Sequence, residues 1–177
     1  MSVNTEALCT LLKQAETVVW IIKDGVSTIS DRHVLVRFKE IPREVLSVLY
    51  SIFFRVPDEG KSLMSSEGEI KEIEVGHLPS IEEATITGQV TKYLKECFPP
   101  YEDDPLLTRV IQLGDRYVLV QEKYVQLTTD RNVVGFKEDE SLIFLGNGEI
   151  SILPVRVFGG FMQIKMKELT AYFERAM

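Results

Sequence analysis

The start of the chain changes from a helical spacing of apolar side chains to a strand-like one. A helix is predicted from a cap at Asn4 or Thr5 to about Thr17, because its apolar residues recur every three or four positions. The run 18–22 (VVWII) is continuously apolar and rich in β-branched residues, which favours a strand. Residues 23–25 (KDG) predict a tight turn after it.

Two further strands and a packed helix are predicted next. The strands cover residues 26–29 and 33–38, and the second of them alternates apolar and polar positions. Pro42 is tolerated in the first turn of a helix. The apolar face of residues 45–53 is wide, so this helix should be deeply packed and should stop before Pro57.

The middle of the chain, residues 58–80, is polar and rich in Gly and Ser. Only Ile70, Ile73 and Val75 offer a weak strand there, so we predict a junction between two halves. Residues 84–94 favour a strand because β-branched threonines recur in them.

A six-residue motif occurs twice, as DRHVLV at 31–36 and as DRYVLV at 115–120. An apolar strand precedes each copy, at 18–22 and at 109–113. A helix follows each copy, and in the second case it is predicted over residues 122–129. The repeat indicates a duplicated scaffold.

The end of the chain predicts a hairpin and then a helix. Residues 141–145 and 149–157 flank Gly146-Asn147-Gly148, a strong hairpin signal because Asn and Gly accept positive φ. After the break at 158–160, residues 161–177 carry an apolar helical stripe with methionines and aromatics, which is adaptable enough to bind a partner. The expected contact residues are Met162, Met166, Leu169, Tyr172 and Phe173. Packing of this stripe on the chain's own sheet is the alternative.

These elements predict an α+β fold in which two sequential, pseudo-repeated halves of antiparallel strands and helices share one core. The first half is assigned to residues 1–80 and the second to residues 81–160. Residues 161–177 are expected to form a C-terminal amphipathic helix.

Charge and cysteine content narrow the classes of partner. The net charge is −7 and the basic residues are dispersed, which disfavours direct nucleic-acid binding unless the chain assembles as a homo-oligomer. No apolar run is long enough to cross a bilayer and no signal peptide is recognisable, so we expect a cytoplasmic protein without membrane contact. Cys9 and Cys97 lack metal-ligand neighbours and should be reduced thiols. A protein partner is expected, and no cofactor.

No catalytic or metal-binding motif is recognisable in the sequence. His33 is predicted to be a packing residue of a strand, since Tyr117 replaces it in the second copy of the motif. His77 follows Glu72 and Glu74, a spacing that suits a metal, but a solvated loop histidine is the favoured interpretation.

The two Asp-Arg pairs of the repeat, 31–32 and 115–116, have a structural interpretation. At the start of a strand, Asp accepts hydrogen bonds from the local backbone and Arg faces solvent. We therefore expect neither pair to be reactive.

The last predicted hairpin resembles the closing strand of the DNA sliding clamp superfamily. In bacterial clamps this strand carries a hydrophobic residue, Pro, a second hydrophobic residue and Arg, which Leu153, Pro154, Val155 and Arg156 match. Together with the two-half order, the resemblance implies a clamp-like fold, also found in small uncharacterised phage-type proteins. The first helix carries Lys13 as its only base, and a single two-half copy could encircle DNA only within a multi-subunit ring.

The resulting hypothesis is a non-enzymatic protein-interaction module of viral or mobile-element type, acting on replication or defence proteins. One alternative is an acidic inhibitor that mimics nucleic acid through the loop residues Glu102, Asp103 and Asp104, a contact that high salt should weaken. Another is a small enzyme that uses His33 or His77 with neighbouring carboxylates.

Overall fold

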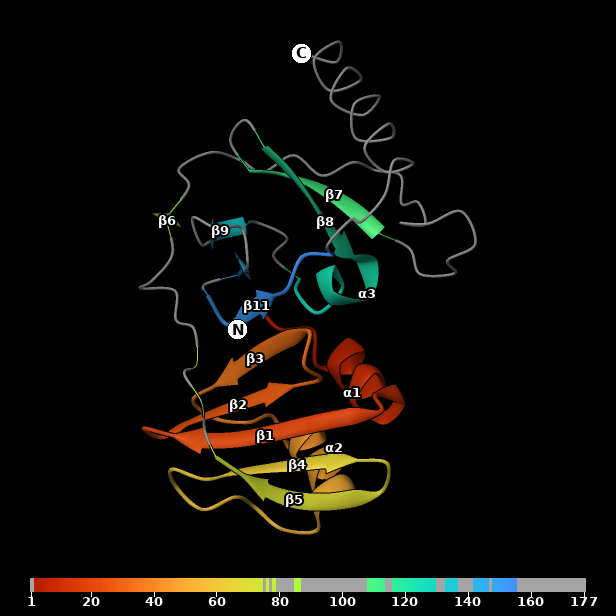
Figure 1. Cartoon of the computed structure of the whole chain (residues 1–177), viewed down its shortest axis with the longest axis vertical. Coiled ribbons are helices and arrows are strands. Elements are labelled where there is room, and N and C mark those ends of the chain that lie inside the picture. Colours follow the sequence, from red (N-terminus) through yellow and green to blue (C-terminus); the bar gives the residue numbers. More distant parts are fainter. Residues whose placement is uncertain are drawn as a thin grey trace.

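The computed structural model is a mixed α+β structure dominated by one large antiparallel sheet (Figure 1). The structure describes residues 2–74, 76, 78, 85–86, 108–113, 116–129, 133–136, 142–146 and 148–155. The helices are α1 (Thr5–Gln14), α2 (Arg43–Phe53) and α3 (Glu122–Val125). The strands are β1 (Thr17–Lys23), β2 (Val26–Ser30), β3 (Val34–Phe38), β4 (Ser62–Ser66), β5 (Glu69–Ile73), β6 (Thr85–Ile86), β7 (Thr108–Leu113), β8 (Arg116–Gln121), β9 (Val133–Phe136), β10 (Ile143–Leu145) and β11 (Ile150–Ile152).

Among the described strands, nine form one sheet in the order β5-β4-β1-β2-β3-β11-β10-β9-β6, and β7 pairs separately with β8. The sheet passes from the early strands to the late ones where β3 pairs with β11, with Val36 opposite Ile150. Every pairing within it is antiparallel. Strands distant in sequence therefore share one hydrogen-bonded layer.

One face of the sheet is apolar and packs against α1 and α2 (Figure 1). Trp20 stands opposite Leu63 on one neighbouring strand and Ile29 on the other, and Ile29 stands opposite Val36. All four side chains are buried, since paired residues of an antiparallel ladder point to the same face. The helices cover this face with Leu8, Leu11, Leu12, Val45, Val48, Leu49 and Phe53.

Three local signals within the first fifty residues are confirmed, although α1 ends at Gln14 and β1 already begins at Thr17. The Asn4 side chain caps α1 by accepting a hydrogen bond from the Ala7 backbone at 3.2 Å. Asp24 and Gly25 both have positive φ, as a two-residue hairpin turn requires. Helix α2 begins after Pro42 and buries the predicted apolar face.

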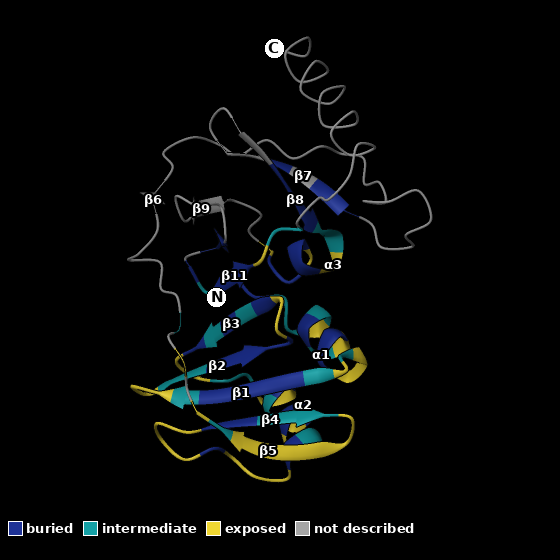
Figure 2. Ribbon diagram, viewed as in Figure 1, coloured by how far each residue is buried: buried dark blue, intermediate teal, exposed yellow. Residues whose placement is uncertain are grey.

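The polar stretch in which a junction and a weak strand are predicted contains a hairpin of the main sheet, and β5 includes Ile70 and Ile73 of that weak strand. Strands β4 and β5 pair along their whole length, and Glu67 and Gly68 form the turn between them with φ of 53° and 80°. Strand β5 is the outermost described strand at one edge of the sheet. Its side chains are therefore largely exposed, and most of them are charged (Figure 2). A strand with little to bury carries no apolar alternation for sequence reasoning to detect.

The second half shows a similar order of elements in a different setting. Strands β7 and β8 and the short α3 occur where the repeated motif predicts them, and β10 and β11 form the predicted hairpin. The first copy of the motif lies in the large sheet, whereas the second lies in the separate β7–β8 pair. A duplicated, clamp-like scaffold therefore stays a prediction. The helix expected over 161–177 lies outside the described residues.

Candidate protein-interaction surface

Asp31 has the structural role that the sequence indicates. Its Oδ1 accepts hydrogen bonds from the backbone N–H groups of His33 and Val34 at 2.9 and 3.0 Å. Arg32 is exposed and has a φ of 79°. The prediction that the Asp binds local backbone and the Arg faces solvent is confirmed for this copy.

The same carboxylate also binds a residue from the later part of the chain. The hydroxyl of Tyr124 donates a hydrogen bond to Oδ2 of Asp31 at 2.8 Å, and both residues are buried. Burial, followed by the interaction with Asp31, raises the pKa of Tyr124 above its ordinary value. The hydrogen bond between two buried residues from distant parts of the chain makes this cluster a structural link.

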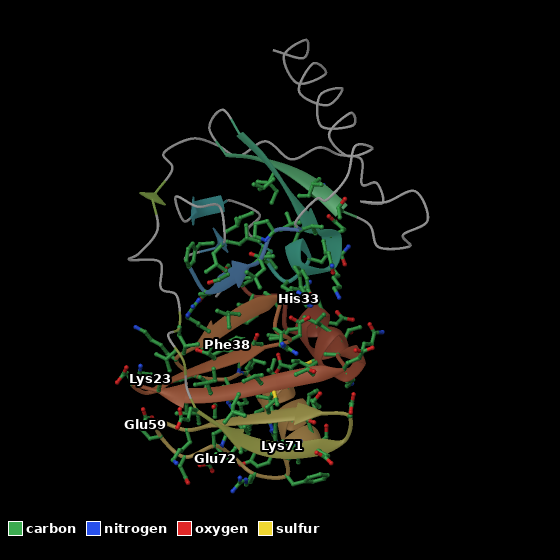
Figure 3. The ribbon with its side chains drawn as sticks, viewed as in Figure 1. Lys23, His33, Phe38, Glu59, Lys71 and Glu72 are labelled. Carbon is green, nitrogen blue, oxygen red and sulfur yellow. The ribbon has the colours of Figure 1, made fainter. Side chains whose placement is uncertain are left out.

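His33 does not occupy the packed position predicted for it. Strand β3 begins one residue later, at Val34, and His33 is exposed (Figure 3). Its ring lies 6.3 Å from the Tyr124 ring, centroid to centroid. The prediction of an interior packing residue is wrong, because the Asp31 turn places the side chain before the strand starts. His77 lies outside the described residues.

A buried ion pair stabilises the base of the β7–β8 pair. The Arg109 guanidinium donates to both carboxylate oxygens of Glu122, and the two side chains are only 10% and 13% exposed. Bidentate Arg–carboxylate contacts are strong and fix orientation. Glu122 begins α3, so the pair ties this helix to β7.

Several large apolar side chains are exposed to solvent. Five large apolar residues are exposed among those the structure describes: Tyr50, Phe54, Val56, Ile70 and Leu153. The first four come from the end of α2, the segment after it and β5, and we call these four the apolar cluster. Phe54 is 79% exposed, the most of the five.

An ion pair and the sheet register relate the segment after α2 to one side of β5. Arg55 lies 3.9 Å from Glu72, which brings the segment after α2 against this strand. Glu72 is opposite Leu63, and Leu63 faces the helices. Ile70 has the same orientation as Glu72, since alternate residues of a strand share a face. Ile70 and the contact of Arg55 with Glu72 therefore lie on the helix side of β5.

The other charges near β5 surround this edge without forming an ion-binding site. Lys71 pairs with Glu69 at 2.7 Å, and Lys61 pairs with Glu72 at 2.9 Å. Each pair lowers the pKa of its carboxyl, and the pair with Glu72 raises the pKa of Lys61. Figure 3 shows Lys71 and Glu72 on β5, at the outer limit of the sheet.

An open hollow of about 630 Å³ lies at the end of β5 and is lined by residues of both charge signs: Lys23, Gly60, Lys61, Glu72, Ile73 and Glu74. Mixed charge of this kind selects neither an anion nor a cation. No group of three His, Cys, Asp or Glu residues that could hold a metal occurs within the described ranges.

The contact residues expected from the sequence are not placed. Met162, Met166, Leu169, Tyr172, Phe173, Glu102, Asp103 and Asp104 all lie outside the described residues. Sequence reasoning offered only a weak strand at Ile70 and Ile73 and did not identify β5 as a contact surface; a further signal for this hairpin was the Glu67-Gly68 turn between two five-residue segments. No helix in the described part of the chain is long and apolar enough to cross a membrane.

Comparison of the chain with protein-family models, curated proteins and solved structures finds no match.

Proposed function

We propose that this chain is a non-enzymatic protein-interaction module whose contact surface includes the apolar cluster and the edge of β5. The observations that support this proposal are four exposed apolar side chains, at the end of α2, just after it and on β5, and the position of β5 as the outermost described strand of its sheet. An edge strand presents unpaired N–H and C=O groups, and neighbouring apolar side chains add area and selectivity. Proteins commonly use this combination to recognise extended segments of a partner.

The conformation of Phe54 adds support to the proposal. This residue caps the C-terminal end of α2 in the left-handed region, with a φ of 59°. A non-glycine residue there costs about 1–2 kcal/mol, and glycine is the usual choice at this position. Because the side chain is exposed, it recovers little of that cost through packing. A strained, exposed aromatic residue is what a contact surface would contain.

The class of partner follows from the sequence resemblance. A clamp-like fold in a protein of viral or mobile-element type favours a replication or defence protein as the target. The sheet that continues from β3 into β11 supports a fold in which two parts of the chain share one layer. The terminal helix and the acidic loop would add contacts outside the surface described above.

Site-specific photo-crosslinking in the source cell tests the proposal. A photoreactive phenylalanine analogue replaces Phe54, and the control carries it at Leu153, which is also exposed but lies just after β11. We expect a discrete protein adduct from position 54 that is absent from position 153. Identical adducts at both positions, or none at position 54, would overturn the proposal.

A substitution at the same residue gives a second measure of the proposal. Phe54→Gly suits the left-handed backbone, so we expect it to keep or raise the free energy of unfolding. The partner identified by crosslinking should co-purify less with Phe54→Gly than with the unchanged protein. Full recovery of that partner by Phe54→Gly would contradict a role for the side chain.

A further inference from the structure

The charge order along β5 makes this edge complementary to itself. The strand reads Glu69-Ile70-Lys71-Glu72-Ile73, and four of these five residues are exposed. Glu69 and Lys71 point to the face opposite the helices, whereas Ile70 and Glu72 point to the helix side. When two identical strands pair antiparallel around a two-fold axis, each residue meets a residue of its own face in the other copy.

Only one central register of such a pair avoids like charges. With the axis beside Ile70, Ile70 lies opposite Ile70 of the second copy. Glu69 of each copy then lies opposite Lys71 of the other. An axis beside Glu69, Lys71 or Glu72 would instead place two carboxylates or two ammonium groups directly opposite each other. Opposite charges across a ladder stabilise the pair by about 0.2–1 kcal/mol, and like charges destabilise it.

We propose that the partner bound at the β5 edge is a second copy of this chain, paired antiparallel through β5 with Ile70 at the two-fold axis. This inference rests on the proposed function, because it names the occupant of the same surface, and it leaves the replication or defence protein to the predicted terminal helix and acidic loop. The existing 2.7 Å contact between Lys71 and Glu69 becomes one side of a square of four alternating charges. The contacts of Glu72 with Lys61 and Arg55 lie toward the helix side and are left intact.

The same axis places the helix sides of the two copies on one face of the joined sheet. The segment of each copy that contacts Glu72 through Arg55, and that also carries the exposed Phe54 and Val56, therefore lies on that face. Removal of this apolar surface from water adds stabilisation that a five-residue strand pair alone would lack. Charges on an edge strand usually prevent its pairing with a strand of another chain. Here the charges disfavour the other registers and permit the register with Ile70 at the axis.

The oligomeric state of charge-swap variants of the full chain tests the proposal. Sedimentation equilibrium of the purified protein should show a dimer whose dissociation constant rises with salt. Glu69→Lys and Lys71→Glu should each weaken the dimer by about tenfold or more, since each places like charges opposite at two equivalent positions. The double variant Glu69→Lys with Lys71→Glu restores complementarity and should recover the dimer.

Charge changes near α1 serve as matched controls. Glu16→Lys and Lys13→Glu make the same charge changes at exposed positions in and just after α1, and both should leave the dimer unchanged. Circular dichroism of every variant establishes that it is folded. A monomer at all concentrations, or a double variant no better than the singles, would overturn the dimer. If a monomeric protein still gives a foreign adduct at position 54, the proposed function stands and only this partner assignment fails.

Discussion

The Tyr124 hydroxyl binds Oδ2 of Asp31 at 2.8 Å, across 93 positions of sequence. The other oxygen of the same carboxylate organises the turn before β3. One buried side chain therefore shapes a local turn and anchors α3, the helix of the later part of the chain. The backbone adds to this link, because Leu153 donates to the His33 carbonyl at 2.9 Å and Val155 donates to the Leu119 carbonyl at 2.7 Å.

Tyr124→Phe removes the hydroxyl and keeps the ring. We expect a loss of about 1–3 kcal/mol in the free energy of unfolding, because Oδ2 of Asp31 then lacks this donor in a buried position. Urea unfolding followed by circular dichroism measures the difference. Tyr50→Phe is the control, since it removes the same hydroxyl from an exposed side chain and its effect should be small. Equal effects of the two substitutions would contradict a specific role for the hydroxyl.

Alkaline pH should weaken the same link. The pKa of Tyr124 is raised by burial and by Asp31, so the folded protein keeps the phenol proton at pH values where the unfolded chain has lost it. The stabilisation is present below about pH 10 and declines above it, by up to about 1.4 kcal/mol per pH unit. Unfolding of the native protein and of Tyr124→Phe should therefore differ less at pH 11 than at pH 8. A constant difference would show that the phenol does not titrate abnormally.

Much of the fold could be predicted where the sequence carries a local signal. The Asn4 cap, the Asp24-Gly25 turn and the apolar face of α2 each depend on a few neighbouring residues, and all are present. The order of strands in the sheet could not be predicted, because β3 and β11 are joined by long-range packing that no local pattern encodes. The separation of the β7–β8 pair from the large sheet could not be predicted for the same reason.

The candidate surface was hidden for two physical reasons. The strand β5 has one described neighbour and little to bury, so its composition resembles that of a loop. Phe54 follows directly after the buried Phe53, and the sequence alone does not show that the helix ends between them. A left-handed cap turns the second ring outward. Sequence reasoning therefore placed the contact residues on the terminal helix, where apolar periodicity was visible.

The Arg109–Glu122 ion pair should matter more than the exposed pairs of β5. Glu122→Gln replaces a buried carboxylate by a neutral amide beside the guanidinium, and we expect a loss of about 2–3 kcal/mol in stability. Glu72→Gln is the matched control, because its contacts with Lys61 and Arg55 are exposed and should contribute little. Chemical denaturation of both variants measures the contrast. Similar losses would mean that burial does not strengthen the Arg109 contact.

Gly146 should tolerate no side chain. Its φ is 58°, and a Cβ atom there would collide with Oγ of Ser2. Gly146→Ala should therefore destabilise the protein by more than the roughly 1–2 kcal/mol of backbone strain alone. Gly68→Ala gives the strain without the collision, since its φ is 80° and a Cβ atom there would have no neighbour within 4 Å. Ser2→Gly should rescue part of the Gly146→Ala loss in urea unfolding, and a failure to rescue would rule out the collision.

Deletion of residues 161–177 separates the two interpretations of the terminal helix. If its methionine and aromatic stripe binds a partner, the chain that ends at Gly160 should unfold at an unchanged urea concentration and lose the partner. The backbone contact of Val155 with Leu119 precedes the deletion and remains available to hold β11 against β8. Retention of the partner measures binding, and hydrogen exchange of β8 and β11 measures the fold. Loss of protection in these strands would instead assign the helix to the core.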